Sequence, residues 1–259
     1  MSSNPIGIFD SGVGGTSIFS AINDLLPNEH IIYLADSKNA PYGTKPKPDI
    51  LELSIKNTNL LLSKGCKVIV VACNTATTNA ISELRQIYQV PFIGIEPAIK
   101  PAALQTKTKT IGILATEGTL SSALFHQTLN LYSSNIKVIE QEGRGVVELI
   151  EAGKINSNKL KLLLKAYIKP MIEAHIDHLV LGCTHYPYLI PILKKMLPQQ
   201  VKILDSGAAV AKQTKAILEK HQILNTEQAT PEISFFSNGN VEVLKTLVGE
   251  GFEVRGLEF

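Results

Sequence analysis

The stretch Val68-Ile69-Val70-Val71-Ala72-Cys73-Asn74-Thr75 has a counterpart 110 residues later, His178-Leu179-Val180-Leu181-Gly182-Cys183-Thr184-His185. Each stretch is an apolar run, then a small residue, a cysteine and a polar pair. Such runs are too short for helices and are typical of buried strands. A cysteine at the same place in both stretches exceeds the weak similarity expected between any two strands. We infer two similar α/β units.

Further short apolar runs, bounded by Gly, Asp, Asn or Pro, predict strands on both sides of these stretches. With the two above they cover residues 6–9, 31–34, 68–72, 92–95, 111–115, 136–139, 179–182, 201–204 and 233–236. Helical spacing predicts helices over residues 50–65, 160–174 and 209–221, and Pro170 is expected to kink or interrupt the second. Alternating strands and helices predict an α/β protein with mostly parallel sheets.

The repeat also predicts the domain organisation. The second unit is expected over residues 98–206, where Ile111-Gly112-Ile113 resembles Ile6-Gly7-Ile8 of the first unit. The turn Asp205-Ser206-Gly207 resembles a point where the chain crosses from one unit to the other, so residues 207–259 are expected to rejoin residues 1–97 in the first unit. The two units would be related by a pseudo-twofold axis.

Composition excludes several classes of protein. The 259 residues carry a net charge of +2 and include only three arginines, so neither a nucleic-acid nor a membrane partner is expected. Three cysteines do not make a disulfide framework, and no stretch resembles a signal peptide or a membrane span. These features predict a soluble protein of the reducing cytoplasm.

Cys73 and Cys183 are the candidate reactive groups. Each follows a predicted strand, where a following helix would place the thiol near backbone N–H groups that favour a thiolate. Buried core cysteines are the plainer interpretation, but two at equivalent places in a repeat weaken it. Cys66 has no counterpart in the second unit and is assigned to packing.

Two thiols facing one cavity allow three chemistries. A redox disulfide is disfavoured because no Cys-x-x-Cys motif occurs, and a metal site would have only Cys73, Cys183 and His185 as ligands. Proton transfer at a stereocentre instead needs a base on one face of a carbon and an acid on the other. A thiolate and a thiol on twofold-related units are suited to this task.

Polar clusters follow other predicted strands. The glycines of Asp10-Ser11-Gly12-Val13-Gly14-Gly15-Thr16 would let the backbone approach an anion, although the spacing matches no nucleotide-binding motif. Pro41-Tyr42-Gly43 forms a turn after the second strand. Thr116 and Thr119 are candidate hydrogen-bond donors to a substrate carboxylate, or helix caps. Glu151 is a candidate catalytic acid, although a glutamate in such a stretch is more often a solvated surface residue.

Taken together, these motifs resemble those of glutamate racemase, a cofactor-independent enzyme of cell-wall synthesis. The resemblance rests on Asp10-Ser11-Gly12-Val13-Gly14-Gly15, Asp36 with Pro41-Tyr42-Gly43, Ala72-Cys73-Asn74-Thr75-Ala76 and Gly182-Cys183-Thr184-His185-Tyr186-Pro187. It runs from about residue 5 to beyond Gly207. It implies two α/β domains with the active site in the cleft between them, no cofactor, and commonly a homodimer.

The resemblance also implies residue roles. Cys73 would act on D-glutamate and Cys183 on L-glutamate, with Asp10 assisting Cys73 and with His185 and Glu151 assisting Cys183. Glu148 is an alternative to Glu151, because residues 141–146 depart from the family pattern just before this carboxylate. Substrate contacts would come from Asp10, Ser11, Pro41, Tyr42, Gly43, Asn74, Thr75, Thr116, Thr119, Thr184 and His185.

Two features of the residues agree with this resemblance. No arginine lies in the matching motifs, so the two carboxylates of glutamate would be held by backbone N–H groups and hydroxyls at helix starts. No lysine is placed as a pyridoxal phosphate anchor would be. The alternatives are an aspartate or hydantoin racemase, a thiol hydrolase using Cys183 and His185, and a binding protein for an acidic ligand.

Overall fold

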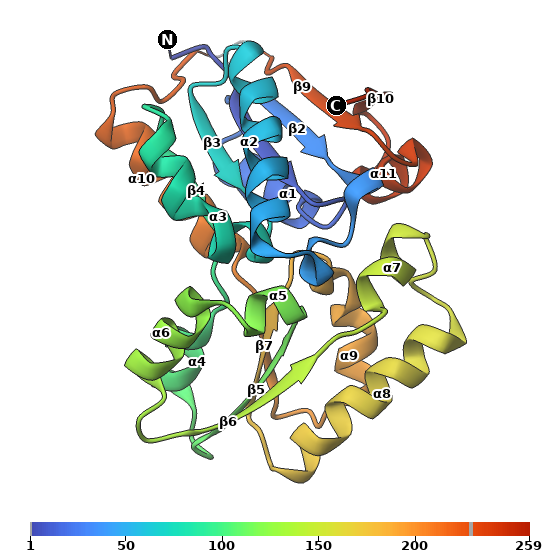
Figure 1. The fold of residues 1–259 in the computed structure, drawn as a ribbon. Helices are drawn as coiled ribbons and strands as arrows, with labels where there is room; N and C mark the ends of the chain where they lie inside the picture. The colour runs from blue at the N-terminus through green and yellow to red at the C-terminus, as the bar shows by residue number, and fades with distance from the viewer. Residues whose placement is uncertain (1, 228–229) are drawn as a thin grey trace.

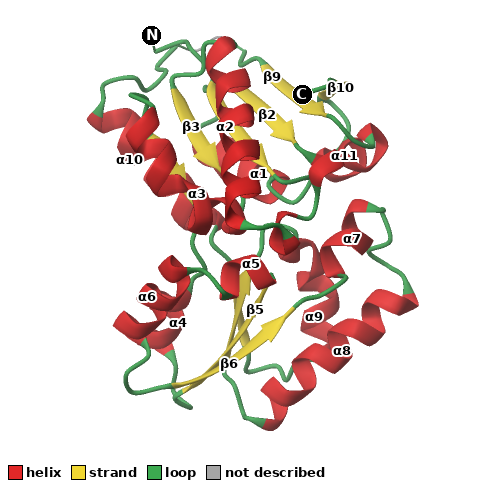
Figure 2. Cartoon of the chain, viewed as in Figure 1, coloured by secondary structure: helices red, strands yellow, loops and turns green. Residues whose placement is uncertain are grey.

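The structure, a computed structural model, describes residues 2–227 and 230–259. Within these residues the strands form two parallel sheets (Figures 1 and 2). The first sheet has the order β10-β9-β2-β1-β3-β4, from β1 (Ile6–Asp10), β2 (Ile31–Ala35), β3 (Val68–Val71), β4 (Phe92–Gly94), β9 (Ile233–Ser237) and β10 (Glu253–Gly256). The second has the order β6-β5-β7-β8, from β5 (Thr110–Ala115), β6 (Lys137–Glu142), β7 (His178–Gly182) and β8 (Lys202–Leu204).

Helices cover both faces of the first sheet because its strands are apolar on both sides. In β1, Ile8 packs in one core cluster with α1 (Thr16–Leu25) and α10 (Gly207–Lys220). Its neighbour Phe9 packs in another cluster with α2 (Lys47–Ser63) and α3 (Asn74–Ile87). Successive side chains of a strand point to opposite faces, so a continuous apolar run is buried on both. Helix α11 (Val241–Val248) precedes β10.

The second sheet is layered in the same way. In β7, Leu181 packs with α7 (Val146–Glu151), α8 (Asn158–Glu173), η3 (Tyr186–Leu189) and α9 (Ile190–Met196). Its neighbour Val180 packs with α4 (Ile99–Gln105) and α6 (Ala123–Tyr132) on the other face. The short helix α5 (Glu117–Leu120) follows β5, and two single 3₁₀ turns, η1 (Ser37–Asn39) and η2 (Tyr42–Thr44), follow β2.

These elements confirm the predicted α/β fold and all nine predicted strands. The observed strand ends lie within two residues of the predicted ones, except that β6 ends three residues later. The tenth strand, β10, was not predicted. The three predicted helices correspond to α2, α8 and α10. Pro170 lies inside α8 without interrupting it, three residues before the helix ends at Glu173.

Both cysteines lie where the strand order of their sheet reverses. From β1 the chain crosses to β2 on one side and then to β3 on the other, and β5, β6 and β7 repeat this path. In open parallel sheets, ligands bind beyond the carboxyl ends of the strands at such a switch point. Cys73 follows β3 and Cys183 follows β7, so the topology directs both thiols to the same kind of place.

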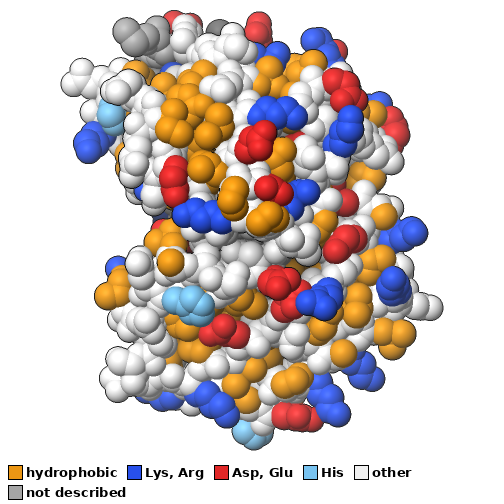
Figure 3. Space-filling model, in the orientation of Figure 1, with side chains coloured by type: hydrophobic (Ala, Val, Ile, Leu, Met, Phe, Trp, Pro, Cys, Tyr) orange, Lys and Arg blue, Asp and Glu red, His pale blue; other side chains and the backbone are white. Residues whose placement is uncertain are grey.

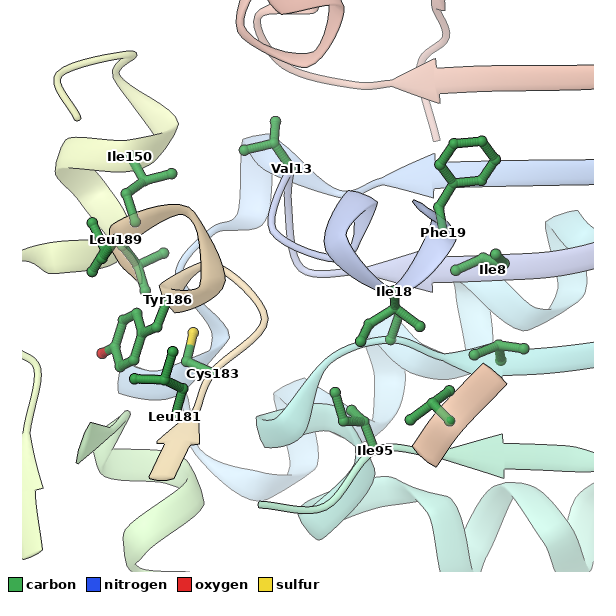
Figure 4. Close-up of a cluster of buried hydrophobic side chains, with 14 of the residues drawn as sticks. Ile8, Val13, Ile18, Phe19, Ile95, Ile150, Leu181, Cys183, Tyr186 and Leu189 are labelled. Atoms are coloured by element: carbon green, nitrogen blue, oxygen red, sulfur yellow. The ribbon is translucent and has the colours of Figure 1, made fainter. Parts of the chain in front are cut away.

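The two sheets share one continuous core. Ile8 and Val13 of the first half belong to the same cluster of buried side chains as Ile150, Cys183 and Tyr186 of the second (Figure 4). The sheets join the strands in the grouping predicted from the repeat, while the boundaries at residues 97/98 and 206/207 stay a prediction. No helix in residues 2–227 and 230–259 is both long and apolar enough to span a membrane.

Candidate active site

One narrow pocket lies between the carboxyl ends of the two sheets. Both candidate thiols line it, together with Ser11, Pro41, Tyr42, Gly43, Asn74, Thr75, Thr116, Val147, Thr184 and His185. The structure therefore brings together nearly all the residues predicted to bind substrate. A second hollow, lined by Gly43, Thr116, Glu142, Arg144 and Glu148 among others, adjoins it at the narrowing between the two halves, visible in Figure 3.

Cys73 caps the amino end of α3, as predicted. Its Sγ accepts the N–H of Ala76 at 3.4 Å and lies 3.6 Å from Oγ of Ser11. Burial raises the pKa of the Cys73 thiol, and the charge of Asp10 raises it further. The hydrogen bond from the helix end lowers this pKa, as expected, but it does not outweigh burial, so the net effect favours the thiol over the thiolate.

Asp10 lies behind the pocket wall and does not line it. Its Oδ2 accepts the N–H of Gly15 at 2.8 Å, and its Oδ1 accepts the hydroxyl of Thr184, from the other half, at 3.3 Å. Complete burial raises the pKa of Asp10 to about 6, against the opposing charge of His185. The carboxyl group can thus change charge at mildly acidic pH, and it contacts residues of both halves of the protein.

Cys183 has a different setting from Cys73. It precedes a short 3₁₀ helix, η3, whose N-cap is His185, so Cys183 is not itself a helix cap. Its Sγ lies 3.7 Å from Nδ1 of His185. An imidazole takes the place of the helix N-terminus that the repeat predicted, and the two thiols are chemically distinct although their topology is equivalent.

His185 and Glu151 form a buried ion pair. Nε2 of His185 lies 2.5 Å from Oε1 of Glu151, and His185 is 1% exposed. Burial opposes a charged imidazole, but the hydrogen bonds to Cys183 and Glu151 outweigh it and raise the pKa of His185 well above its usual value. Burial also opposes charge on Glu151, but its bonds to His185, Val13 and Ser37 lower its pKa. Both shifts favour an imidazolium paired with a carboxylate.

Glu151, and not Glu148, makes this contact. Its carboxylate also accepts the N–H of Val13 at 2.7 Å and the hydroxyl of Ser37 at 2.8 Å, both from the first half of the protein. Glu148 is exposed and lines the outer pockets. A Cβ on Gly12 would collide with this carboxylate and one on Gly14 with the His185 ring, which explains two glycines of the first loop.

Three threonine hydroxyls form a cluster at the site. The Oγ1 atoms of Thr75 and Thr116 are 2.8 Å apart, and that of Thr119 is 3.0 Å from Thr116. Thr75 and Thr116 line the pocket, whereas Thr119 lies behind them. Hydroxyls at the starts of α3 and α5 suit a carboxylate ligand.

The amide of Asn74 is the clearest indication of a ligand-binding site. The side chain is 3% exposed and lines the pocket, yet neither Nδ2 nor Oδ1 has a hydrogen-bond partner among the described residues. An unpaired buried amide is costly, so such groups are expected to be satisfied by a bound molecule. The orphaned donor and acceptor point to a small polar ligand.

Sequence reasoning gave no role to several residues of the site. Asp36, part of the motif after β2, is fully buried and accepts the hydroxyl of Tyr42 at 2.5 Å, which fixes a residue of the pocket wall. Ser37 lies in the same polar segment, but the sequence did not show its contact with Glu151. Val147 gave no signal, because its place in the pocket depends on contacts between distant segments. Among residues 2–227 and 230–259, no three His, Cys, Asp or Glu side chains gather in a way that could hold a metal ion.

Comparison with known proteins identifies the class. The profile of the family described as Asp/Glu/Hydantoin racemase matches residues 6–214. Glutamate racemase of Ectopseudomonas mendocina is 45% identical over 256 residues, which cover 97% of each chain. The chain belongs to the Asp/Glu/hydantoin racemase family. It is an amino-acid racemase, an isomerase that inverts a stereocentre.

Solved structures of glutamate racemases share the whole fold. The crystal structure of isoform RacE1 from Bacillus anthracis superposes with a TM-score of 0.89 at 30% identity, covering 100% of this chain and 98% of that one. The Escherichia coli enzyme in complex with L-glutamate and the activator UDP-MurNAc-ala gives a TM-score of 0.87 at 32% identity, covering 98% and 97%. The predicted two-domain α/β architecture is confirmed.

Proposed function

We propose that this chain interconverts L- and D-glutamate without a cofactor, by proton transfer at Cα between Cys73 and Cys183. The observation that carries the proposal is that both thiols line one small pocket, each with its own polar partners. A racemase needs an acid and a base on opposite faces of one carbon, and two thiols from related halves provide them.

The chemical step needs no oxidant or reductant. With L-glutamate, the thiolate of Cys183 takes the proton from Cα, and the bonding electron pair stays on the substrate as a carbanion. The thiol of Cys73 then gives its proton to the opposite face, which yields D-glutamate and a Cys73 thiolate. D-Glutamate reacts by the reverse path, starting from the Cys73 thiolate.

The surroundings of the two thiols support this assignment. The ring of His185, held by Glu151, lies 3.7 Å from the sulfur of Cys183, within reach for exchanging a proton with it. Burial keeps Cys73 protonated, as the proton donor for L-glutamate must be. Asp10 lies where its charge acts on Cys73, so its protonation would assist formation of the Cys73 thiolate when D-glutamate reacts.

Glutamate as substrate is supported by the donors of the pocket and by the relatives. Asn74, Thr75, Thr116, Ser11 and Thr184 line the pocket and offer amide and hydroxyl donors for two carboxylates, with amide and hydroxyl oxygens as acceptors for an amino group. Relatives from Ectopseudomonas mendocina and Herpetosiphon aurantiacus, 45% and 42% identical, are named glutamate racemase, and solved neighbours include complexes with L-glutamate and with D-glutamate. We further propose that D-glutamate serves peptidoglycan synthesis in the cytoplasm, and that the enzyme is a homodimer.

The test is proton NMR in D₂O with L-glutamate and, separately, D-glutamate, without added pyridoxal phosphate. We expect the Cα proton signal of both enantiomers to disappear and the optical rotation to fall to zero. If aspartate or a hydantoin exchanges and glutamate does not, the substrate assignment is wrong. If nothing exchanges, a binding protein becomes the better interpretation.

A further inference from the structure

Ser37 contacts the Glu151 carboxylate from the opposite half of the protein. Its hydroxyl donates to Oε2 at 2.8 Å, while Oε1 of the same carboxylate contacts His185 and the N–H of Val13. The two oxygens therefore face different partners. Ser37 thus fixes the rotation of the carboxylate about its last bond, which the contact with His185 alone does not.

The position of Ser37 is itself fixed by the end of β9. Asn238 accepts the backbone N–H of Lys38 at 2.9 Å and donates to Oδ1 of Asp36 at 2.5 Å, so it holds the residues on either side of Ser37. Gly239 packs so closely that a Cβ there would lie 2.7 Å from Cβ of Ser37. The ends of β2 and β9 thus fix the position of the Ser37 hydroxyl, which indicates that its contact with Glu151 has a function.

Ser37 does not touch the space where substrate would bind. It is absent from the lining of the pocket that holds both thiols, and instead lines an outer pocket with Pro41, Glu148 and Glu151. Any effect of Ser37 on the reaction must therefore pass through Glu151 and His185. Because water from the outer pocket can partly replace its hydroxyl, we expect a moderate effect.

We propose that Ser37 is a positioning residue: it holds the Glu151 carboxylate on His185 when the two halves are together, and thereby supports proton transfer by Cys183 and not by Cys73. This inference rests on the proposed function. It also explains why the Glu151 carboxylate bonds residues of both halves. The His185–Glu151 pair beside Cys183 is fully held only when the loop after β2 contacts α7.

The test compares Ser37→Ala, Ser37→Thr and Ser63→Ala with the wild-type enzyme. Ser63 is an exposed serine at the end of α2 whose hydroxyl bonds only its own helix, so it is a matched control. Rates are measured with L- and D-glutamate, each with hydrogen and with deuterium at Cα. For Ser37→Ala we expect kcat/KM to fall roughly ten-fold in both directions, equally, as the equilibrium constant requires. Ser37→Thr keeps the hydroxyl and should recover most of the activity.

The isotope effects separate positioning from a merely structural role. If the Cys183 step is slowed, the isotope effect on kcat/KM rises for L-glutamate, whose C–H bond Cys183 breaks, and falls for D-glutamate. An unchanged kcat/KM, isotope effects that stay symmetric, or a threonine variant as slow as the alanine variant would each overturn the role of Ser37 while wild-type racemisation stands. A wild-type enzyme that exchanges neither enantiomer would instead overturn the proposed function and this inference with it.

Discussion

Nε2 of His185 lies 2.5 Å from Oε1 of Glu151, at a point where the side chain of His185 is almost completely buried. The pair makes the two thiols unequal. Cys183 lies beside a buried cation, whereas Cys73 lies beside a helix end and a buried carboxyl group. The two halves of the protein share a topology, and they differ in the polar groups that would control each proton transfer.

Replacing Glu151 by Gln should make the protonated form of His185 less stable. An amide cannot balance an imidazolium, so we expect the pKa of His185 to fall and kcat/KM to decrease roughly 10- to 100-fold. A titration of ¹⁵N-labelled histidine followed by NMR measures the pKa, and racemisation is measured on the same samples. Glu173→Gln, on the exposed face of α8, is the control. A His185 pKa unaffected by Glu151→Gln would contradict the ion pair.

Replacing Asp10 by Asn should change how stability depends on pH. Burial raises the pKa of Asp10 from 3.8 to about 6 in the folded protein, so the folded state holds this proton more tightly than the unfolded state. The stabilising effect of the protonated group is present below pH 3.8 and is lost as pH rises through about 6. Asparagine cannot ionise and avoids this loss.

Urea unfolding of both proteins at several pH values measures the difference. Relative to wild type, the free energy of unfolding of Asp10→Asn should rise by up to about 3 kcal/mol between pH 4 and pH 7, an order-of-magnitude figure. Racemisation should fall in the same variant. A stability difference that is constant with pH would show that Asp10 is not a buried, reluctantly ionised group.

Replacing Thr116 by Val should weaken substrate binding more than the chemical step. The hydroxyl lies in the pocket beside that of Thr75, at 2.8 Å, and is far along the chain from both catalytic candidates. Losing one bond to a carboxylate should raise KM for both enantiomers roughly ten-fold. Steady-state rates with Thr116→Val, and with the exposed Thr246→Val as control, give the comparison. A large loss of kcat with KM unchanged would argue against a binding role.

Most strands were predictable because they are apolar runs that the fold buries on both faces, whereas β6 and β8, at the edges of the second sheet, are only partly buried. The exception, β10, reads Glu253-Val254-Arg255-Gly256 and lies at the exposed edge of the sheet, where little apolar surface is needed. Pro170 was expected to disturb its helix but lies in the last turn. The two α/β halves could be inferred from the cysteines because both halves have the same strand order, which places Cys73 and Cys183 at equivalent switch points.

The polar partners of the thiols were less predictable, since they depend on contacts between distant segments. Glu148 and Glu151 lie three residues apart on one short helix, and only packing decides which of them meets His185. The bond from Ser37 to Glu151 spans 114 residues. The helix end that lowers the pKa of Cys73 can be seen in the sequence, whereas the depth of burial that outweighs it cannot.

The central claim is that Cys73 and Cys183 act on opposite faces of one carbon. The most direct test follows Cα proton exchange in D₂O for L- and D-glutamate with Cys73→Ala, Cys183→Ala and, as control, Cys66→Ala, whose thiol is buried in the core away from the pocket. We expect racemisation to fall by at least about 10³-fold in the first two variants, the scale of a lost acid–base group, and to persist in the third. Residual exchange should be confined to L-glutamate in Cys73→Ala and to D-glutamate in Cys183→Ala. Racemisation that survives loss of either thiol, or exchange of the same enantiomer by both variants, would contradict the account.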